Sequence, residues 1–309
     1  MKYKNLGNSG LKVSEIGLGT YINFGEKISD SEAIKIVHKA YELGINFFDT
    51  ADAYAEGKAE KILGKSLKGF RRDSVVVASK CFMPRNESIN ARGLSRKNIR
   101  HSVDESLKNS KLEYIDLLYC HRFDPECPLE ETFSAIHDLI QAGKILYWGI
   151  SRWETEQIND ALDLCNKLNK YKPIANQYVY NLLNTEGEDQ FEFSKKNGIG
   201  VVSYSALAQG VLTEKYLGEK IPKESRAANE DLKQRMWNFN EKDFARVQQL
   251  NDFAQKQNLK LNHLAISWCL ANSSISSVLV GASSVAQLED NLKALDLSRE
   301  QSLSVKQVS

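Results

Sequence analysis

The stretch Gly44-Ile-Asn-Phe-Phe-Asp-Thr-Ala-Asp-Ala-Tyr54 decides the fold. Its largely apolar residues 45–48 have the composition of a short buried strand and lead directly into a polar turn. The turn carries a carboxylate, Asp49, and five residues later a phenol, Tyr54. Loops at the carboxyl ends of parallel strands hold the functional groups of many α/β proteins. The stretch therefore predicts a parallel α/β fold with a site at this strand end.

The same alternation of a short apolar strand and an amphipathic helix continues along the chain. Helix start signals are clear at Ser29 and at Ser95, and Gly44 ends the first helix. Counting from residue 16 gives eight strand-then-helix units. The strands are expected at residues 16–19, 45–48, 75–78, 115–120, 147–150, 174–178, 200–204 and 277–280. The helices are expected from residue 30, over 58–67, from Ser95, and over 129–142, 154–168, 190–196, 241–257, 261–271 and 285–295. Eight such units predict a (β/α)8 TIM barrel.

Two segments lie outside this repeat. Residues 3–6 and 11–14 flank Gly7-Asn-Ser-Gly10 and predict an N-terminal β-hairpin that plugs one end of the barrel. Residues 212–240 form a long charged loop after strand seven, and loops of this length in compact domains are usually functional. Since no linker or low-complexity run divides residues 1–309, we expect a single domain.

The composition excludes several classes of protein. Forty-one basic residues face forty acidic ones, so the charge excess of a nucleic-acid or anionic-membrane binder is missing. No apolar run could cross a bilayer, and the first residues lack the apolar core of a signal peptide. The five cysteines are odd in number and scattered, as in proteins with reduced thiols. These features predict a cytoplasmic protein.

Four residues near the predicted strand ends suit proton transfer to a carbonyl oxygen: Asp49, Tyr54, Lys80 and His121. A tyrosine with a pKa of about 10 is a poor acid at neutral pH unless a cation stabilises its phenolate. Lys80 can supply that cation, Asp49 can orient it, and His121 can hydrogen-bond the substrate oxygen. Each residue alone also has a structural explanation, as a helix cap, a packed ring, a solvated amine or a structural histidine. Their joint placement favours catalysis.

The segment Val280-Gly-Ala-Ser-Ser-Val-Ala-Gln-Leu-Glu-Asp-Asn291 leads from strand eight into a helix whose N-terminus could bind a phosphate. Its polar face carries Ser283, Gln287, Asp290 and Asn291, although an ordinary solvated outer helix would look similar. No Gly-x-Gly-x-x-Gly follows a strand, so a Rossmann site is not supported. Cys120, His121 and Cys127 lack zinc-ligand spacing, and we expect no metal site.

With these motifs the sequence resembles the aldo-keto reductases over essentially its whole length. The shared motifs are Gly44-Ile-Asn-Phe-Phe-Asp-Thr-Ala with Tyr54, Lys80, His121, Gly149-Ile-Ser-Arg-Trp153, Asn176-Gln177, Tyr204-Ser-Ala-Leu-Ala-Gln-Gly210, Leu212-Thr-Glu-Lys-Tyr216 and Gly281-Ala-Ser. Within the family it is most similar to the branch of the voltage-gated potassium channel β subunits. That similarity rests on Ala55-Glu-Gly-Lys-Ala-Glu60, Arg92-Gly-Leu-Ser-Arg-Lys97, Tyr147-Trp-Gly-Ile-Ser-Arg-Trp153 and Ile266-Ser-Trp-Cys-Leu270.

The resemblance implies an NADP(H)-dependent reductase of small aromatic, aliphatic or dicarbonyl aldehydes and ketones. Tyr54 would be the general acid, with Asp49, Lys80 and His121 completing a tetrad. The residues implied in NADPH/NADP+ binding are Gly19, Thr20, Tyr21, Asp49, Ser151, Arg152, Gln177, Tyr204, Ser205, Leu207, Gly210, Lys215, Arg226, Gly281, Ser283, Gln287, Asp290 and Asn291. The substrate pocket would be walled by Tyr21, Tyr54, Phe82, Met83, His121 and Trp153.

Two departures from the family pattern bear on the cofactor. Asp290 stands where Glu is common, and Ala282 and Ser283 stand where many members carry a cation for the 2′-phosphate. His121, by contrast, is retained where the mammalian channel subunits usually have asparagine, which favours catalysis. The alternative is an NADP(H)-binding redox sensor attached to a potassium channel or transporter, with little turnover. A homotetramer is expected by the same analogy.

Overall fold

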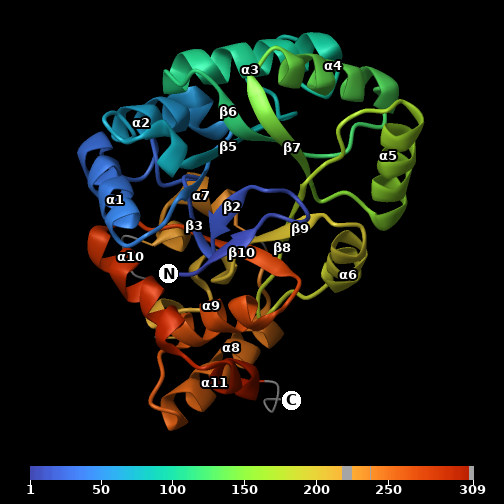
Figure 1. Ribbon diagram of the computed structural model, residues 1–309. Helices are drawn as coiled ribbons and strands as arrows, with labels where there is room; N and C mark the ends of the chain where they lie inside the picture. The colour runs from blue at the N-terminus through green and yellow to red at the C-terminus, as the bar shows by residue number, and fades with distance from the viewer. Residues whose placement is uncertain (218–224, 237, 306–309) are drawn as a thin grey trace.

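In the computed structural model, the described residues (1–217, 225–236 and 238–305) form a closed parallel β-barrel surrounded by helices (Figure 1). The barrel strands run in the order β10-β3-β4-β5-β6-β7-β8-β9. Their bounds are β3 (Ile16–Gly19), β4 (Phe47–Asp49), β5 (Val76–Cys81), β6 (Ile115–Cys120), β7 (Ile145–Ser151), β8 (Ala175–Val179), β9 (Gly200–Tyr204) and β10 (Ile275–Val280). The predicted (β/α)8 TIM barrel is confirmed.

The outer layer consists of helices that follow the strands in turn (Figure 1). Ser29 and Ser95 cap α1 and α3 by accepting a hydrogen bond from a backbone amide of the first turn, as predicted. The helix bounds are α1 (Asp30–Glu42), α2 (Lys58–Ser66), α3 (Arg96–Ser110), α4 (Leu129–Gln141), α5 (Thr155–Lys167), α6 (Glu188–Lys196), α7 (Glu230–Gln234), α8 (Glu241–Lys256), α9 (Leu261–Ala271), α10 (Val285–Leu292) and α11 (Arg299–Ser304). Among the described helices, none is long and apolar enough to span a membrane.

The N-terminal hairpin closes the end of the barrel where the strands begin. Its strands β1 (Tyr3–Asn5) and β2 (Lys12–Ser14) pair antiparallel, and Figure 1 shows them in front of the barrel. Leu6 and Val13 are fully buried in the same apolar cluster as Phe47 and Tyr119 of the barrel. A Cβ on Gly7 would stand 2.3 Å from the Gly198 carbonyl oxygen, so the turn needs glycine to dock this closely. The predicted plug is confirmed. Because it covers this end of the barrel, a site would have to lie at the opposite end, where the strands finish.

Several boundaries differ from the predicted ones in ways that matter for the site. Strand β4 starts at Phe47 rather than at residue 45, because the Ile45 amide still donates to the Ala40 carbonyl in the turn that leaves α1. Strand β5 extends to Cys81 and therefore includes Lys80. Consequently Asp49 and Lys80 lie within strands, and His121 is the first residue after β6.

The segment after β9 contains helical turns and a short helix where the sequence predicted one long irregular loop. Within the predicted loop over residues 212–240, the described part contains 3₁₀ turns at Glu214–Tyr216 and Arg226–Ala228 and the helix α7. Residues 218–224 and 237 of that loop lie outside the described residues. The last predicted helix, over 285–295, divides into α10 and a 3₁₀ turn at Lys293–Asp296.

Candidate active site

A cavity of about 730 Å³ opens at the carboxyl end of the barrel. Side chains at the ends of all eight barrel strands, or on the loops that follow them, line it. Its volume lies within the usual range of small-molecule sites, roughly 300–1,000 Å³. Several lining residues other than glycine have positive φ angles, among them Ala55 (50°), Arg152 (55°), Ser205 (58°) and Gln209 (59°). Backbone strain of this kind concentrates at functional sites, so the mouth is the candidate active site.

At the floor of the cavity a lysine and an aspartate form a buried ion pair. Lys80 is fully buried, and its ammonium donates to the Asp49 carboxylate and to the Thr50 carbonyl at 2.8 Å. The second oxygen of Asp49 accepts a hydrogen bond from Gln177 Nε2 at 2.8 Å. Burial lowers the pKa of Lys80, and the Asp49 charge opposes that shift. The pair is held by strands β4, β5 and β8, so its geometry is fixed by the barrel itself.

Tyr54 stands above this pair on the 3₁₀ turn that follows β4. The Lys80 ammonium lies 4.9 Å from the centroid of the Tyr54 ring, and the Tyr21 ring packs against it at the same centroid distance. Burial raises the pKa of the Tyr54 phenol well above its usual value, and the Asp49 charge raises it further. Arg122 acts in the opposite direction. Tyr54 is therefore a neutral phenol that can donate a proton.

His121 faces Tyr54 from the end of β6. Its ring meets the Tyr54 ring edge-on with 6.1 Å between centroids, and its amide donates to the Cys81 carbonyl at 3.0 Å. Burial lowers the pKa of His121 well below its usual value, and the charges of Lys80 and Arg122 add to the shift. The imidazole is therefore neutral near pH 7 and can donate one hydrogen bond to an oxygen in the cavity.

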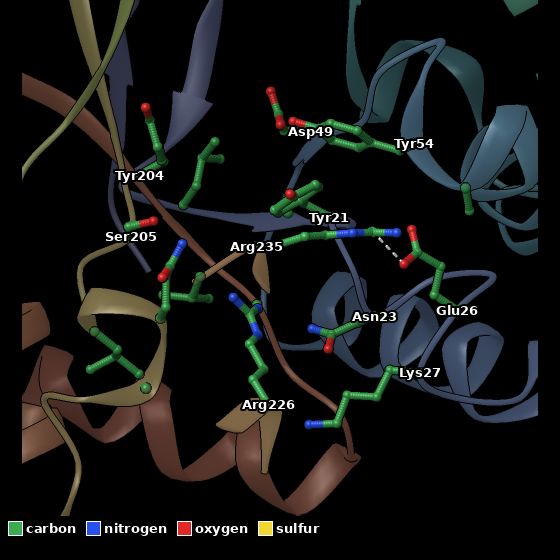
Figure 2. A pocket seen from close by; sticks show the side chains of 18 of the residues that line it. Tyr21, Asn23, Glu26, Lys27, Asp49, Tyr54, Tyr204, Ser205, Arg226 and Arg235 are labelled. Atoms are coloured by element: carbon green, nitrogen blue, oxygen red, sulfur yellow. Dashed lines mark hydrogen bonds and ion pairs between the residues drawn. The ribbon is translucent and has the colours of Figure 1, made fainter. Parts of the chain in front are cut away.

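The other end of the cavity is rich in cations. Lys27, Lys215 and Arg226 lie close enough to influence one another: burial, followed by the charges of Lys27 and Arg226, lowers the pKa of Lys215 to about 8. Figure 2 shows Lys27 and Arg226 on the side of the cavity away from Asp49 and Tyr54. Three cationic side chains gathered at one end of a cavity suit a phosphate group.

Glycines shape this cationic end. Gly210 has a φ of 98°, and a Cβ there would stand 2.3 Å from the Lys215 ammonium nitrogen. At the end of β10, a Cβ on Gly281 would press on the Asn23 amide at 3.1 Å. Beside it, the Ser283 amide and hydroxyl both donate to Gln287 Oε1 at 2.6 and 3.0 Å.

The structure brings most of the residues predicted from the sequence to this cavity. Lys80 lies just behind its surface, bonded to Asp49. The predicted residues that line the cavity are Gly19, Tyr21, Asp49, Tyr54, Met83, His121, Ser151, Arg152, Gln177, Tyr204, Ser205, Leu207, Gly210, Lys215, Arg226, Gly281, Ser283 and Gln287.

Three residues predicted to bind the cofactor lie away from the cavity surface. Thr20 is fully buried, and its amide donates to the Asp49 carbonyl. Asp290 accepts hydrogen bonds from Lys260 and Asn262 at 2.9 Å; burial alone would raise its pKa, but these bonds bring it down to about 2. Asn291 is buried and accepts from the same Asn262 amide at 3.2 Å. These side chains support the site from behind.

The structure places two of the predicted pocket walls in or against a hydrophobic core cluster outside the barrel. Trp153 is fully buried and packs edge-on against Phe123 with 5.0 Å between ring centroids. It lies in the outer core because the left-handed backbone at Arg152 turns the chain before it. Phe82 packs against the same outer core. Neither residue lines the cavity.

Sequence reasoning missed several charged and polar residues at the mouth, namely Asn23, Glu26, Lys27, Arg122, Gln209 and Arg235. Arg122 directly follows His121, so the sequence could have predicted it at the mouth from its position beside a predicted catalytic residue. Arg235 and Glu26 form an ion pair at 2.6 Å across the mouth (Figure 2). They lie more than 200 residues apart, and no local pattern joins them.

Comparison with known proteins agrees with this geometry. The model of the Aldo/keto reductase family matches residues 15–309. Two curated relatives are named "Probable voltage-gated potassium channel subunit beta". The one from Oryza sativa subsp. japonica is 40% identical over 302 residues, which cover 96% of this chain and 92% of the relative. The one from Arabidopsis thaliana is 39% identical with the same coverage. The chain therefore belongs to the aldo/keto reductase family.

Proposed function

We propose that this oxidoreductase uses NADPH to reduce aldehydes and ketones to alcohols, with Tyr54 as the general acid. Small aromatic, aliphatic and dicarbonyl compounds are the expected substrates, and the cytoplasm is the expected compartment. One observation carries the proposal: the neutral phenol of Tyr54 lies between the buried Lys80–Asp49 pair and a neutral His121, at the open end of the barrel.

The residues of the cavity fit a nicotinamide dinucleotide phosphate. Lys215, Arg226 and Lys27 offer cationic groups at one end for the pyrophosphate and the 2′-phosphate. Ser151, Arg152 and Gln177 lie at the tetrad end, where they would hold the carboxamide, and Tyr204 would face the ring. The three clustered cations support a preference for NADP over NAD, with Lys27 adding to the residues inferred from the sequence. When bound, the cofactor supplies the hydride.

The tetrad residues would divide the proton chemistry among them. As the substrate oxygen gains negative charge, the O–H bond of Tyr54 breaks and its proton passes to that oxygen. The Lys80 ammonium, 4.9 Å from the ring centroid, stabilises the phenolate that remains. Among the described residues the Asp49 carboxylate is hydrogen-bonded to the side chains of Lys80 and Gln177, so its proposed role is to orient the cation. Neutral His121 donates a hydrogen bond that positions the oxygen.

The test is NADPH consumption by the purified protein with a panel of aromatic and aliphatic aldehydes. We expect measurable turnover, and Tyr54→Phe should lower it by about 100- to 10,000-fold, the usual contribution of a positioned acid. Tyr3→Phe, which changes an exposed tyrosine of the plug, is the matched control and should behave as the unmodified protein. Unchanged activity in Tyr54→Phe would refute the assignment.

A second candidate function rests on the names of the two relatives, which describe each as a probable voltage-gated potassium channel β subunit. In this case the protein would bind NADP(H), assemble as a homo-oligomer on a potassium channel or transporter, and turn over little substrate. Recovery of a membrane partner in a pull-down, together with tight NADPH binding and no activity on any carbonyl, would favour it. The complete tetrad makes us prefer the enzyme.

A further inference from the structure

Arg122 is a half-buried cation at the tetrad end of the cavity, and the proposed proton chemistry does not use it. It follows His121 directly, lines the cavity, and donates one hydrogen bond to the His121 carbonyl. Its charge influences the pKa of both Tyr54 and His121, so the guanidinium lies close to the two groups that would touch the substrate oxygen.

Arg122 differs from the other arginines that approach buried groups. Arg72 pairs with Asp116 at 2.5 Å, and Arg85 lies 3.4 Å from Asp52. Over residues 1–217, 225–236 and 238–305, no carboxylate lies within ion-pair distance of Arg122. The charged neighbour that acts on it is a second cation, Arg152. Burial lowers the pKa of Arg122, and Arg152 lowers it further.

An arginine placed in this way needs an anion. Removing a guanidinium from water without a counter-charge is unfavourable, and an arriving carboxylate would relieve both the desolvation and the repulsion from Arg152. One N–H group of Arg122 is used by the His121 carbonyl, and among the described residues the other four have no protein acceptor, which leaves them for planar recognition of a carboxylate. Met83 and Pro84 also line the cavity, on the loop after β5, the strand that neighbours β6, and offer apolar contact to the body of such a substrate.

We propose that Arg122 binds the carboxylate of the substrate, so that the preferred substrates are carbonyl compounds that also carry a carboxylate. This inference rests on the proposed reductase function and narrows its substrate class. The carbonyl oxygen would lie at Tyr54 and His121, with the carboxylate directed to the neighbouring guanidinium. Arg122 is then a specificity residue, and removing it should lower kcat/KM more for charged substrates than for neutral ones.

The test compares para-carboxybenzaldehyde with its methyl ester, which differ in charge and keep the same reacting group. We expect kcat/KM to be about 10- to 100-fold higher for the acid, the usual effect of a charge-assisted hydrogen bond. Arg122→Leu should remove this preference, so that the ratio of kcat/KM for the acid to kcat/KM for the ester falls to about one. The ratio is the readout because the Arg122 charge also acts on the pKa of Tyr54, and its loss would change kcat/KM for both substrates alike. Arg122→Lys, which keeps the charge but loses the planar fork, should retain part of it. Arg100→Leu, an equal charge change at an exposed position of α3, should behave as the unmodified protein.

Two kinetic outcomes would overturn the inference while leaving the reductase function intact. One is equal kcat/KM for acid and ester in the unmodified protein. The other is a parallel loss for both substrates in Arg122→Leu, which would instead make Arg122 a stabiliser of the Tyr54 phenolate.

If neither aldehyde is reduced, the proposed function fails and binding decides the inference separately. Benzoate is then titrated by calorimetry into the NADPH-loaded protein. At least tenfold weaker binding to Arg122→Leu than to Arg100→Leu would support the carboxylate site, a ratio typical of a charge-assisted bond. Equal binding, or none to any form, would refute it.

Discussion

The two ends of the cavity hold their charges in opposite ways. At the tetrad end, Lys80 is fully buried and bonded to Asp49, which Gln177 also holds, and all three residues lie on barrel strands. At the cationic end, Lys215 and Arg226 lie on 3₁₀ turns, and no carboxylate in the described part of the chain lies within ion-pair distance of either. The Lys80–Asp49 pair is complete without a ligand, whereas Lys215 and Arg226 have no carboxylate partner among the described residues and suit an anionic ligand.

We infer from this difference that the tetrad end determines the rate of the reaction and the cationic end determines the affinity for the cofactor. A preorganised group costs no rearrangement at the moment of reaction, so the tetrad end suits stabilisation of developing charge. A buried cluster of like charges destabilises the free protein and repays that cost when an anion binds. Substitutions at the two ends should therefore have effects of opposite sign on stability.

The largest effect is expected for Lys80→Met. It leaves the buried Asp49 carboxylate with Gln177 as its remaining side-chain partner among the described residues. Breaking a buried pair in this way costs about 3–5 kcal/mol in the free energy of unfolding, measured by urea denaturation. Turnover should also fall by more than about 100-fold.

The double variant Asp49→Asn/Lys80→Met is the control for this prediction. It removes the isolated charge and should recover much of the lost stability without recovering activity. A loss below about 1 kcal/mol in Lys80→Met, the value of an exposed pair, would contradict the view that the tetrad end is a preorganised buried network.

Lys215→Met should act in the opposite sense. We expect NADPH affinity, measured by fluorescence titration, to fall about 10- to 100-fold because a charge-assisted bond to phosphate is lost. Turnover at saturating NADPH should stay within about threefold, and the ligand-free protein should be no less stable. Lys61→Met, at an exposed position of α2, is the control with the same charge loss. A lower turnover together with unchanged NADPH affinity in Lys215→Met would contradict the assignment of cofactor binding to the cationic end.

The pH dependence of NADPH binding should reflect the titration of Lys215 at the cationic end of the cavity. In the free protein the pKa of Lys215 is about 8, and a bound phosphate raises it. NADPH affinity should therefore be constant below about pH 8 and fall above it, by at most about tenfold per pH unit, because binding then requires proton uptake. Lys215→Met should flatten this step. An NADPH affinity that rises with pH above pH 8 would contradict a role for protonated Lys215 in binding.

The smallest effect is expected for Arg235→Gln. Its ion pair with Glu26 crosses the mouth, but both side chains are partly exposed, so the pair contributes about 0–1 kcal/mol (Figure 2). We expect the NADPH dissociation rate, measured by stopped flow, to rise about twofold to threefold, within that free-energy range. A slower dissociation would show that the ion pair hinders closure.

The features that could be predicted from the sequence lie on the barrel strands and helices, and those that could not lie mostly on the loops of the cationic end. Strand β9 and helix α9 agree with the prediction to the residue, since a buried strand and an apolar helix carry strong local patterns. Asp49 and Lys80 could be found because strand ends converge by topology alone. Lys27 and Arg235 could not, because loops bring them together without any periodic signal. The bond between Asp290 and Lys260 could not be predicted either, because a polar helix face does not show which neighbour will bind it.

The most direct test of the separation between the two ends is the NADPH affinity of Tyr54→Phe, titrated by fluorescence on the variant that has lost turnover. Among the described residues the Tyr54 ring lies against Tyr21, Lys80 and His121, away from the cationic end. We therefore predict a dissociation constant within about threefold of the unmodified protein, a difference below about 0.7 kcal/mol. A loss of tenfold or more, equal to that of Lys215→Met, would show that acid and cofactor site are one coupled unit and would contradict this account.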